Sequence, residues 1–400
     1  MHVSSVYLLR QALGLDTPGT PVKVIEPYQM LGEIKDDLIE VLGVDVVSIA
    51  SPTTMFGYRN ENWKPWQTFD GTPVLVPGDF NTEIEANGDL LMYPEGDRTV
   101  PPSGRMPAGG FYFDAIIRQP PIEEDKLDPA DNLEEFEPIS AADLKHFEVE
   151  AKRLYENTDK AILANFGGTA FGDIALVPAT WLKDPRGIRD VEEWYMSTVL
   201  RKDYVHAIFD RQCEIALENL ARIHAVVGER ITVVFLTGTD FGAQNGPFIS
   251  PKAYRELFKP YHKQLNDWVH ENTTWKTFIH SCGSIFKLLP DILAAGFDIL
   301  NPVQTSAAEM DPATLKAQFG EQVVFWGGGV DTQKTLPFGT PAEVREEVHE
   351  RMLTFGAGGG FIFNPSHNVQ ARVPCENLKA LYKAVQDYRQ YPLKLDSFEV

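Results

Sequence analysis

Short apolar segments that end in small or polar residues recur along the chain, and stretches with helical periodicity separate them. Seven segments share this pattern: residues 43–49, 161–168, 231–240, 277–283, 297–304, 323–331 and 360–368. Strands buried on both faces that alternate with helices are typical of a parallel sheet with helical crossovers. The pattern therefore predicts an α/β fold.

Helical stretches between the predicted strands indicate which type of parallel sheet the chain forms. They are residues 191–227 (two helices), 250–272, 284–296 and 340–358. Seven or eight strand–helix units in about 250 residues favour a closed (β/α)8 TIM barrel over an open doubly wound sheet. The open sheet lacks support, because no G-x-G-x-x-G turn follows the first strand, and neither WGGGVD nor GAGGGF has the spacing of a phosphate loop.

The N-terminal third has a different pattern. Turn signals at residues 87–89 and 94–96 lie between apolar runs, which predicts a β-hairpin excursion within residues 72–96. We expect a single barrel domain over residues 1–400, a hairpin insertion at the barrel mouth over 69–118, and an acidic connection over 119–150.

Composition narrows the function classes. The chain is 43% hydrophobic and 23% charged, and its net charge of −21 argues against nucleic acid and anionic lipid as partners. No run approaches the roughly 20 apolar residues of a membrane span. The first residues lack the pattern of a signal peptide, and three scattered cysteines fit a reducing compartment. These features predict a cytoplasmic protein.

Polar groups follow the ends of the predicted strands. They are Asn165, Asp240, His280 with Cys282, Asn301 with Gln304, Asp331 with Gln333, and Asn364 with His367. In a TIM barrel the C-terminal ends of the strands form the active-site face, so these side chains are expected to converge. This convergence is the main functional signal in the sequence.

Three of these residues are candidate metal ligands. His280 and Cys282 are two residues apart where a strand ends, and His367 follows the last strand. Two imidazoles and a thiolate with one open position are typical of a catalytic zinc site. The alternative remains open that Cys282 is a small core residue and that the histidines only form hydrogen bonds.

Two further regions have both a structural and a functional interpretation. Ser250 and Pro251 predict the start of a helix, but they leave Asp240, Gln244 and Asn245 to face a pocket or to cap a loop. The aromatic residues of the N-terminal region either shape a substrate pocket or form a small core of the hairpin. They are Trp63, Trp66, Tyr93, Phe111 and Tyr112.

Four motifs resemble the uroporphyrinogen decarboxylase superfamily, and its corrinoid-dependent methyltransferases more than its decarboxylases. They are HSCGS (280–284), AAGFDILNPVQ (294–304), FWGGGVDTQKTL (325–336) and FIFNPSHNVQARVPCENLKALYKAV (361–385). The resemblance spans about residues 155–390 and implies a TIM barrel, often dimeric. Those methyltransferases bind zinc through a His-x-Cys pair and a later cysteine. Here His280 and Cys282 match the pair, but His367 occupies the later position, which implies a His-Cys-His site or a lost or rearranged metal.

The resemblance also implies roles and partners. A zinc-dependent methyltransferase would move a methyl group between a small O-, N- or S-methylated substrate and a corrinoid, with zinc binding either the methyl acceptor or the heteroatom of the donor. Its corrinoid (cobalamin) would arrive on a separate protein, because the chain has no D-x-H-x-x-G signature. Asp240 and Asp331 are then candidate catalytic residues, and candidate substrate-binding residues are Gln244, Asn301, Gln304 and Gln333.

Two alternatives to methyl transfer remain open. A metal-free decarboxylase-like lyase that acts on a carboxylated substrate is the second hypothesis. It ranks below methyl transfer because residues 26–38 lack the arginines that a polycarboxylated porphyrinogen needs. A non-catalytic binding protein fits the convergent polar groups least.

Overall fold

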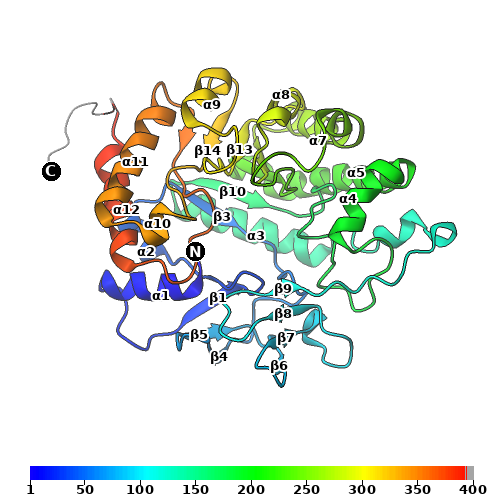
Figure 1. Cartoon of the computed structure of the whole chain (residues 1–400), viewed down its shortest axis with the longest axis horizontal. Helices are drawn as coiled ribbons and strands as arrows, with labels where there is room; N and C mark the ends of the chain where they lie inside the picture. The colour runs from blue at the N-terminus through cyan, green and yellow to red at the C-terminus, as the bar shows by residue number, and fades with distance from the viewer. Residues whose placement is uncertain (392, 394–400) are drawn as a thin grey trace.

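The computed structural model, which describes residues 1–391 and 393, contains the predicted parallel sheet at its centre (Figure 1). Its seven strands are β3 (Val46–Ile49), β10 (Ala161–Asn165), β11 (Val233–Thr237), β12 (Lys276–His280), β13 (Ile299–Asn301), β14 (Val324–Trp326) and β15 (Phe361–Ile362). Each strand overlaps one of the seven predicted segments. They pair in parallel and in chain order, from β3 at one edge to β15 at the other.

This sheet curls into a half-barrel that resembles a TIM barrel. Within the described part of the chain, no pairing joins β3 to β15, so an eighth strand and full closure are not present there. The last residues of the predicted domain, 392 and 394–400, lie outside the described residues. Because all seven strands run in parallel, their C-terminal ends meet at one edge of the sheet.

Helices lie between the strands in sequence, and the last helix follows β15. They are α3 (Ala141–Asn157), α4 (Val191–Leu200), α5 (Lys202–Val227), α7 (Lys259–Asn272), α8 (Leu289–Ala294), α9 (Pro312–Phe319), α10 (Thr335–Phe338), α11 (Pro341–Gly356) and α12 (Cys375–Tyr388). The predicted pair of helices in 191–227 is confirmed as α4 and α5. The predicted cap is also confirmed, since the Ser250 side chain accepts the N–H of Ala253 at the start of α6 (Pro251–Ala253).

The N-terminal third forms two more sheets beside the half-barrel, at the bottom of Figure 1. One contains β1 (Val22–Glu26), β2 (Leu31–Gly32), β4 (Lys64–Gln67) and β5 (Pro73–Val76), and the other contains β6 (Thr82–Ile84), β7 (Leu90–Met92), β8 (Gly104–Met106) and β9 (Asp114–Ala115). The predicted hairpin is β6–β7, closed where the Glu85 N–H donates to the carbonyl of Asp89. However, β5 pairs with β1 instead of continuing this hairpin. That residues 69–118 are an insertion at the mouth stays a prediction.

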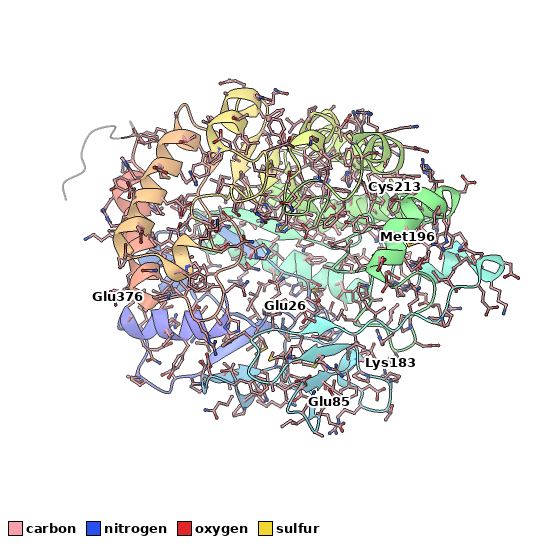
Figure 2. The ribbon with its side chains drawn as sticks, viewed as in Figure 1. Glu26, Glu85, Lys183, Met196, Cys213 and Glu376 are labelled. Atoms are coloured by element: carbon pink, nitrogen blue, oxygen red, sulfur yellow. The ribbon has the colours of Figure 1, made fainter. Side chains whose placement is uncertain are left out.

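Two large apolar clusters hold these parts together. One lies between the parallel sheet and helices α3 to α9, and the other joins α1 (Val3–Ala12), β1 and β5 to α11 and α12. Figure 2 shows Cys213 and Glu376 at opposite ends of the molecule, so Cys375 is remote from Cys213, and all three cysteines are free. Among the described helices, none is both long and apolar enough to cross a membrane.

Candidate functional site

His280, Cys282 and His367 meet at the C-terminal edge of the parallel sheet. Their ligand atoms all lie within 4.8 Å of one another, and Cys282 Sγ is 3.3 Å from His280 Nε2. Tetrahedral zinc with ordinary Zn–S and Zn–N bonds would place such a pair of ligand atoms roughly 3.5 Å apart. The predicted convergence of these three side chains is therefore present, with a spacing that suits a metal ion.

The end of β12 and a tight turn position His280 and Cys282, the first two candidate ligands. His280 is the last residue of β12 and lies opposite Asn301 of β13. The next amide, of Ser281, donates to the carbonyl of Asn301 at 2.7 Å, which continues the ladder for one more residue. Gly283 then adopts a φ of +83° and turns the chain away, a conformation that favours glycine. Cys282 is thus held between the strand and the turn.

Asn301 sets the proton position on His280. Its Nδ2 donates to the carbonyl of Trp326 at 2.9 Å, so its Oδ1 faces His280 Nδ1 at 2.7 Å. Nδ1 must therefore carry the proton, which leaves Nε2 with a free lone pair directed toward Cys282. This arrangement is the one that a metal-binding imidazole requires.

Asp240, in the loop after β11, holds the backbone of Cys282. Its Oδ1 accepts the backbone N–H of Cys282 at 2.6 Å and lies 3.9 Å from His280 Nε2. Tyr195 of α4 anchors this loop, since its hydroxyl donates to the carbonyl of Asp240 at 2.7 Å. Asp240 therefore supports the ligand turn, and its predicted catalytic role stays a prediction.

Burial and neighbouring charges shift the pKa values of the groups in and beside the cluster. Burial, and then the charge of Asp240, raise the pKa of the Cys282 thiol well above its usual range. Burial and the neighbouring His280 lower the pKa of His367. Asp173, which is buried in the loop after β10, has its pKa raised to about 7 by burial, and the charge of Asp240 adds to this shift.

The side-chain amides of Gln304 and Gln244, two predicted substrate-binding residues, form hydrogen bonds with other residues of the chain. Gln304 Oε1 accepts the N–H of Gly283 at 2.8 Å, and its Nε2 donates to Gln244 Oε1 at 3.0 Å. Gln244 in turn donates to the carbonyl of Ser306. These contacts favour a loop-supporting role for Gln244, and its predicted contact with substrate stays a prediction, as do those of Gln304 and Asn301.

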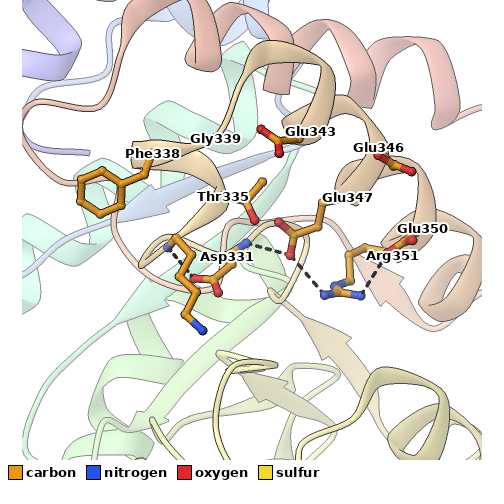
Figure 3. Close-up of a pocket in the computed structure, with 10 residues that line it drawn as sticks. Asp331, Thr335, Phe338, Gly339, Glu343, Glu346, Glu347, Glu350 and Arg351 are labelled. Atoms are coloured by element: carbon orange, nitrogen blue, oxygen red, sulfur yellow. Dashed lines mark hydrogen bonds and ion pairs between the residues drawn. The ribbon is translucent and has the colours of Figure 1, made fainter. Parts of the chain in front are cut away.

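Asp331 and Gln333 lie at a different place. Asp331 lines a cavity of about 690 Å³ beside α11, and none of the three candidate ligands lines that cavity (Figure 3). Its carboxylate accepts the N–H of Gln333 at 2.6 Å, and its own N–H donates to Glu347. The Gln333 side chain is exposed. Asp331 therefore caps the loop after β14, and no contact to the metal cluster supports the predicted roles of these two residues.

A second cavity, of about 410 Å³, opens on His367. Its lining residues are Gln29, Phe111, Tyr112, His367, Gln370 and Ala371. Of the predicted pocket aromatics, Phe111 and Tyr112 are therefore pocket residues. Tyr93 is buried beside the hairpin, whereas Trp66 of β4 packs on Phe80, with ring centroids 5.1 Å apart, in the larger cluster that reaches α11 and α12 instead of in a small core of the hairpin. The N-terminal third thus supplies one wall of a pocket at the cluster.

Sequence reasoning missed Gln29, Asp173 and Tyr195. Gln29 lies in residues 26–38, where only the absence of arginine was considered. Its side chain accepts a hydrogen bond from Asn368 Nδ2 at 2.7 Å, and no local sequence pattern indicates this contact. Asp173 follows Gly172, which has a φ of +60°, in the loop after β10. An acidic residue after a glycine in a strand-end loop was the one available signal. Tyr195 has the appearance of an ordinary helix residue.

Comparison with known proteins gives the family. The uroporphyrinogen decarboxylase (URO-D) family model matches residues 168–388, which is more than half of the chain. Uroporphyrinogen decarboxylase of Pseudoalteromonas atlantica is 25% identical over 49% of this chain and 56% of its own length, and that of Pelobacter propionicus is 26% identical over 58% and 62%. The matched part of the chain thus spans about half to three-fifths of these relatives.

One solved structure, described as a methyltransferase from Methanosarcina mazei, covers 98% of this chain and 100% of its own with 16% identity and a TM-score of 0.49. That similarity carries no argument about activity. The match over residues 168–388 contains β11 to β15 and all three candidate ligands, and on this evidence the chain belongs to the uroporphyrinogen decarboxylase family.

Proposed function

We propose that the chain is a zinc-dependent methyltransferase that moves a methyl group between a small methylated substrate and a corrinoid carried by a separate protein. The observation that carries this proposal is the convergence of His280, Cys282 and His367 within 4.8 Å beside a pocket. A thiolate with two imidazoles favours zinc over magnesium or calcium. Three protein ligands leave a fourth position for the heteroatom that bears the methyl group.

The surrounding residues fit this use of the site. When bound, zinc would supply Lewis acidity that makes the demethylated heteroatom a better leaving group. Asn301 keeps the Nε2 lone pair of His280 available, and Asp240 holds the backbone of Cys282. Cavity walls at His367 orient the donor and exclude water from one side of it. The corrinoid is the methyl acceptor and acts as a second substrate, as expected from the missing D-x-H-x-x-G signature.

A metal-free lyase that removes a carboxyl group is the second candidate. The relatives at about a quarter identity are named decarboxylases, and the pKa of Asp173 is raised to about 7. A carboxyl group that holds its proton near neutral pH is suited to protonate a carbanion after carbon dioxide leaves. In this alternative His280, Cys282 and His367 would only shape the pocket wall.

One experiment separates the two. Zinc-loaded and metal-free wild-type protein would be incubated with free cob(I)alamin and a panel of O-, N- and S-methyl donors, and the conversion to methylcobalamin would be followed by absorbance. The methyltransferase predicts conversion that needs zinc and is lost in Cys282→Ser. Equal turnover without zinc, or release of carbon dioxide from a carboxylated substrate without cobalamin, would support the lyase instead.

A further inference from the structure

An arginine without an ionic partner stands at the edge of the pocket that opens on His367. Arg372 directly follows the lining residue Ala371, and its guanidinium carbon lies 4.6 Å from the ring centroid of Phe111, which also lines the pocket. No ion pair or hydrogen bond engages its side chain among residues 1–391 and 393. In a chain of net charge −21, an unpaired cation beside a cavity marks a place where an anionic group would be stabilised.

The pocket walls offer aromatic faces and uncommitted amide atoms. Gln29 Oε1 accepts the Asn368 amide at 2.7 Å, and its Nε2 has no hydrogen-bond partner among the described residues. Gln370 uses its Nε2 on the carbonyl of Asn368, which leaves its Oε1 as an acceptor. Phe111 is fixed through its own carbonyl, which lies 2.9 Å from Nε2 of His2. No carboxylate is among the lining residues.

These features discriminate among methyl donors. A methylated ammonium ion would be attracted by aromatic rings, but the guanidinium of Arg372 lies over one of these rings and no carboxylate is among the lining residues. A short aliphatic thioether has no ring to stack on Phe111 and Tyr112, the two aromatic residues of the pocket wall. An aromatic donor can stack on either of these rings.

We propose that this pocket binds an aromatic carboxylic acid that carries a methoxy group, with its carboxylate toward Arg372 and its methoxy group toward His367. The inference rests on the proposed function, since it names the donor for the same site. In the transfer the bond between the methyl carbon and the ether oxygen breaks, and a bond between that carbon and the corrinoid cobalt forms. Cobalt(I) is oxidised to cobalt(III), and the oxygen keeps the bonding electrons and takes a proton from water, which yields a phenol.

The test is a binding measurement that needs neither zinc nor cobalamin. Metal-free protein would be titrated calorimetrically with para-methoxybenzoate, anisole, para-methoxyphenyl-trimethylammonium and methylthiopropanoate. We expect para-methoxybenzoate to bind at least about ten-fold more tightly than each of the others. Arg372→Gln should remove its advantage over anisole, and Phe111→Leu should weaken both aromatic ligands. Arg345→Gln is the matched control, because Arg345 also stacks on an aromatic ring, that of Tyr388 at 5.7 Å, but neither Arg345 nor Tyr388 lines or adjoins this pocket in sequence.

The outcomes keep the two proposals apart. Equal affinity for anisole and para-methoxybenzoate, tighter binding of the ammonium or thioether probe, or an unchanged preference in Arg372→Gln would overturn the assignment. Melting temperatures of the variants exclude unfolding as the cause. If wild type binds no zinc but prefers para-methoxybenzoate through Arg372, methyl transfer fails while the pocket assignment stands. If it binds zinc but no aromatic acid, the pocket assignment fails and methyl transfer survives.

Discussion

Gly283 packs directly against the backbone of Gly242. A Cβ built on Gly283 would lie 2.2 Å from the carbonyl oxygen of Gly242, and one built on Gly242 would lie 2.6 Å from the carbonyl of Cys282. The loop after β11 and the turn after β12 therefore meet where only glycine fits. This contact fixes Cys282 between the loop that carries Asp240 and the sheet.

The first prediction concerns this contact. Gly283→Ala should lower the free energy of unfolding by at least about 2 kcal/mol more than Gly358→Ala, and it should weaken zinc binding because the turn must move. Gly358 is a matched control, since its φ is +74° but no atom lies within 4 Å of an added Cβ. Urea unfolding and zinc titration of both variants give the comparison. Equal losses in the two would show that backbone strain alone matters and that Gly242 does not constrain Cys282.

A second prediction follows from the hydrogen bond between Asn301 and His280. Asn301→Ala frees the imidazole to place its proton on Nε2, so zinc affinity should fall about 10- to 100-fold. Asn272→Ala is the control, because Asn272 also donates to a tryptophan carbonyl, that of Trp268, but on the exposed side of α7. Competition with a chelating dye measures both affinities. An Asn301→Ala protein that binds zinc as tightly as Asn272→Ala would refute the positioning role.

A third prediction concerns pH and the buried His262. Burial lowers its pKa to about 3, its Nδ1 lies 3.0 Å from the hydroxyl of Tyr254, and its Nε2 has no partner among the described residues. The unfolded chain takes up a proton below its ordinary pKa of 6.5, whereas the folded chain does so only near 3. Stability from this group is therefore complete above 6.5 and falls as the pH drops from 6.5 toward 3.

The measurement compares wild type with His262→Gln, which does not titrate. Between pH 7 and pH 5 the wild-type free energy of unfolding should fall by about 2 kcal/mol more than that of the variant, at roughly 1.4 kcal/mol per pH unit below 6.5. Urea unfolding at each pH provides both values. Parallel pH dependences would mean that His262 is already accessible to protons in the folded chain.

The strands and the cluster of candidate ligands could be predicted because their signals are local. Apolar runs buried on both faces identify strands, and a strand end followed by His280-x-Cys282 places two ligands without knowledge of distant contacts. His367 required one further step, the parallel order of the sheet, which brings the ends of β12 and β15 to the same edge. The first step uses the periodicity of apolar residues, and the second uses the sheet topology that this periodicity predicts.

The pocket could not be predicted in the same way. Gln29 and Phe111 reach it from the N-terminal sheets, and contacts such as that between Asn368 and Gln29 join residues more than three hundred positions apart. No periodic pattern encodes such a contact. For Asp331 the local signal was present but ambiguous. An aspartate at the end of a strand was expected in the site, but its carboxylate accepts the N–H of Gln333 and caps the loop. Position after a strand does not by itself distinguish capping from chemistry.

The most direct test of the account is the zinc content of the purified protein after reconstitution, for wild type, Cys282→Ser and His367→Ala. Cys375→Ser serves as the control, because Cys375 lies at the start of α12 and takes no part in the cluster. We predict about one zinc ion per chain in wild type and in the control, and its loss in the other two variants. Folded wild type that holds no zinc, or Cys282→Ser and His367→Ala proteins that retain it fully, would contradict the proposed metal centre.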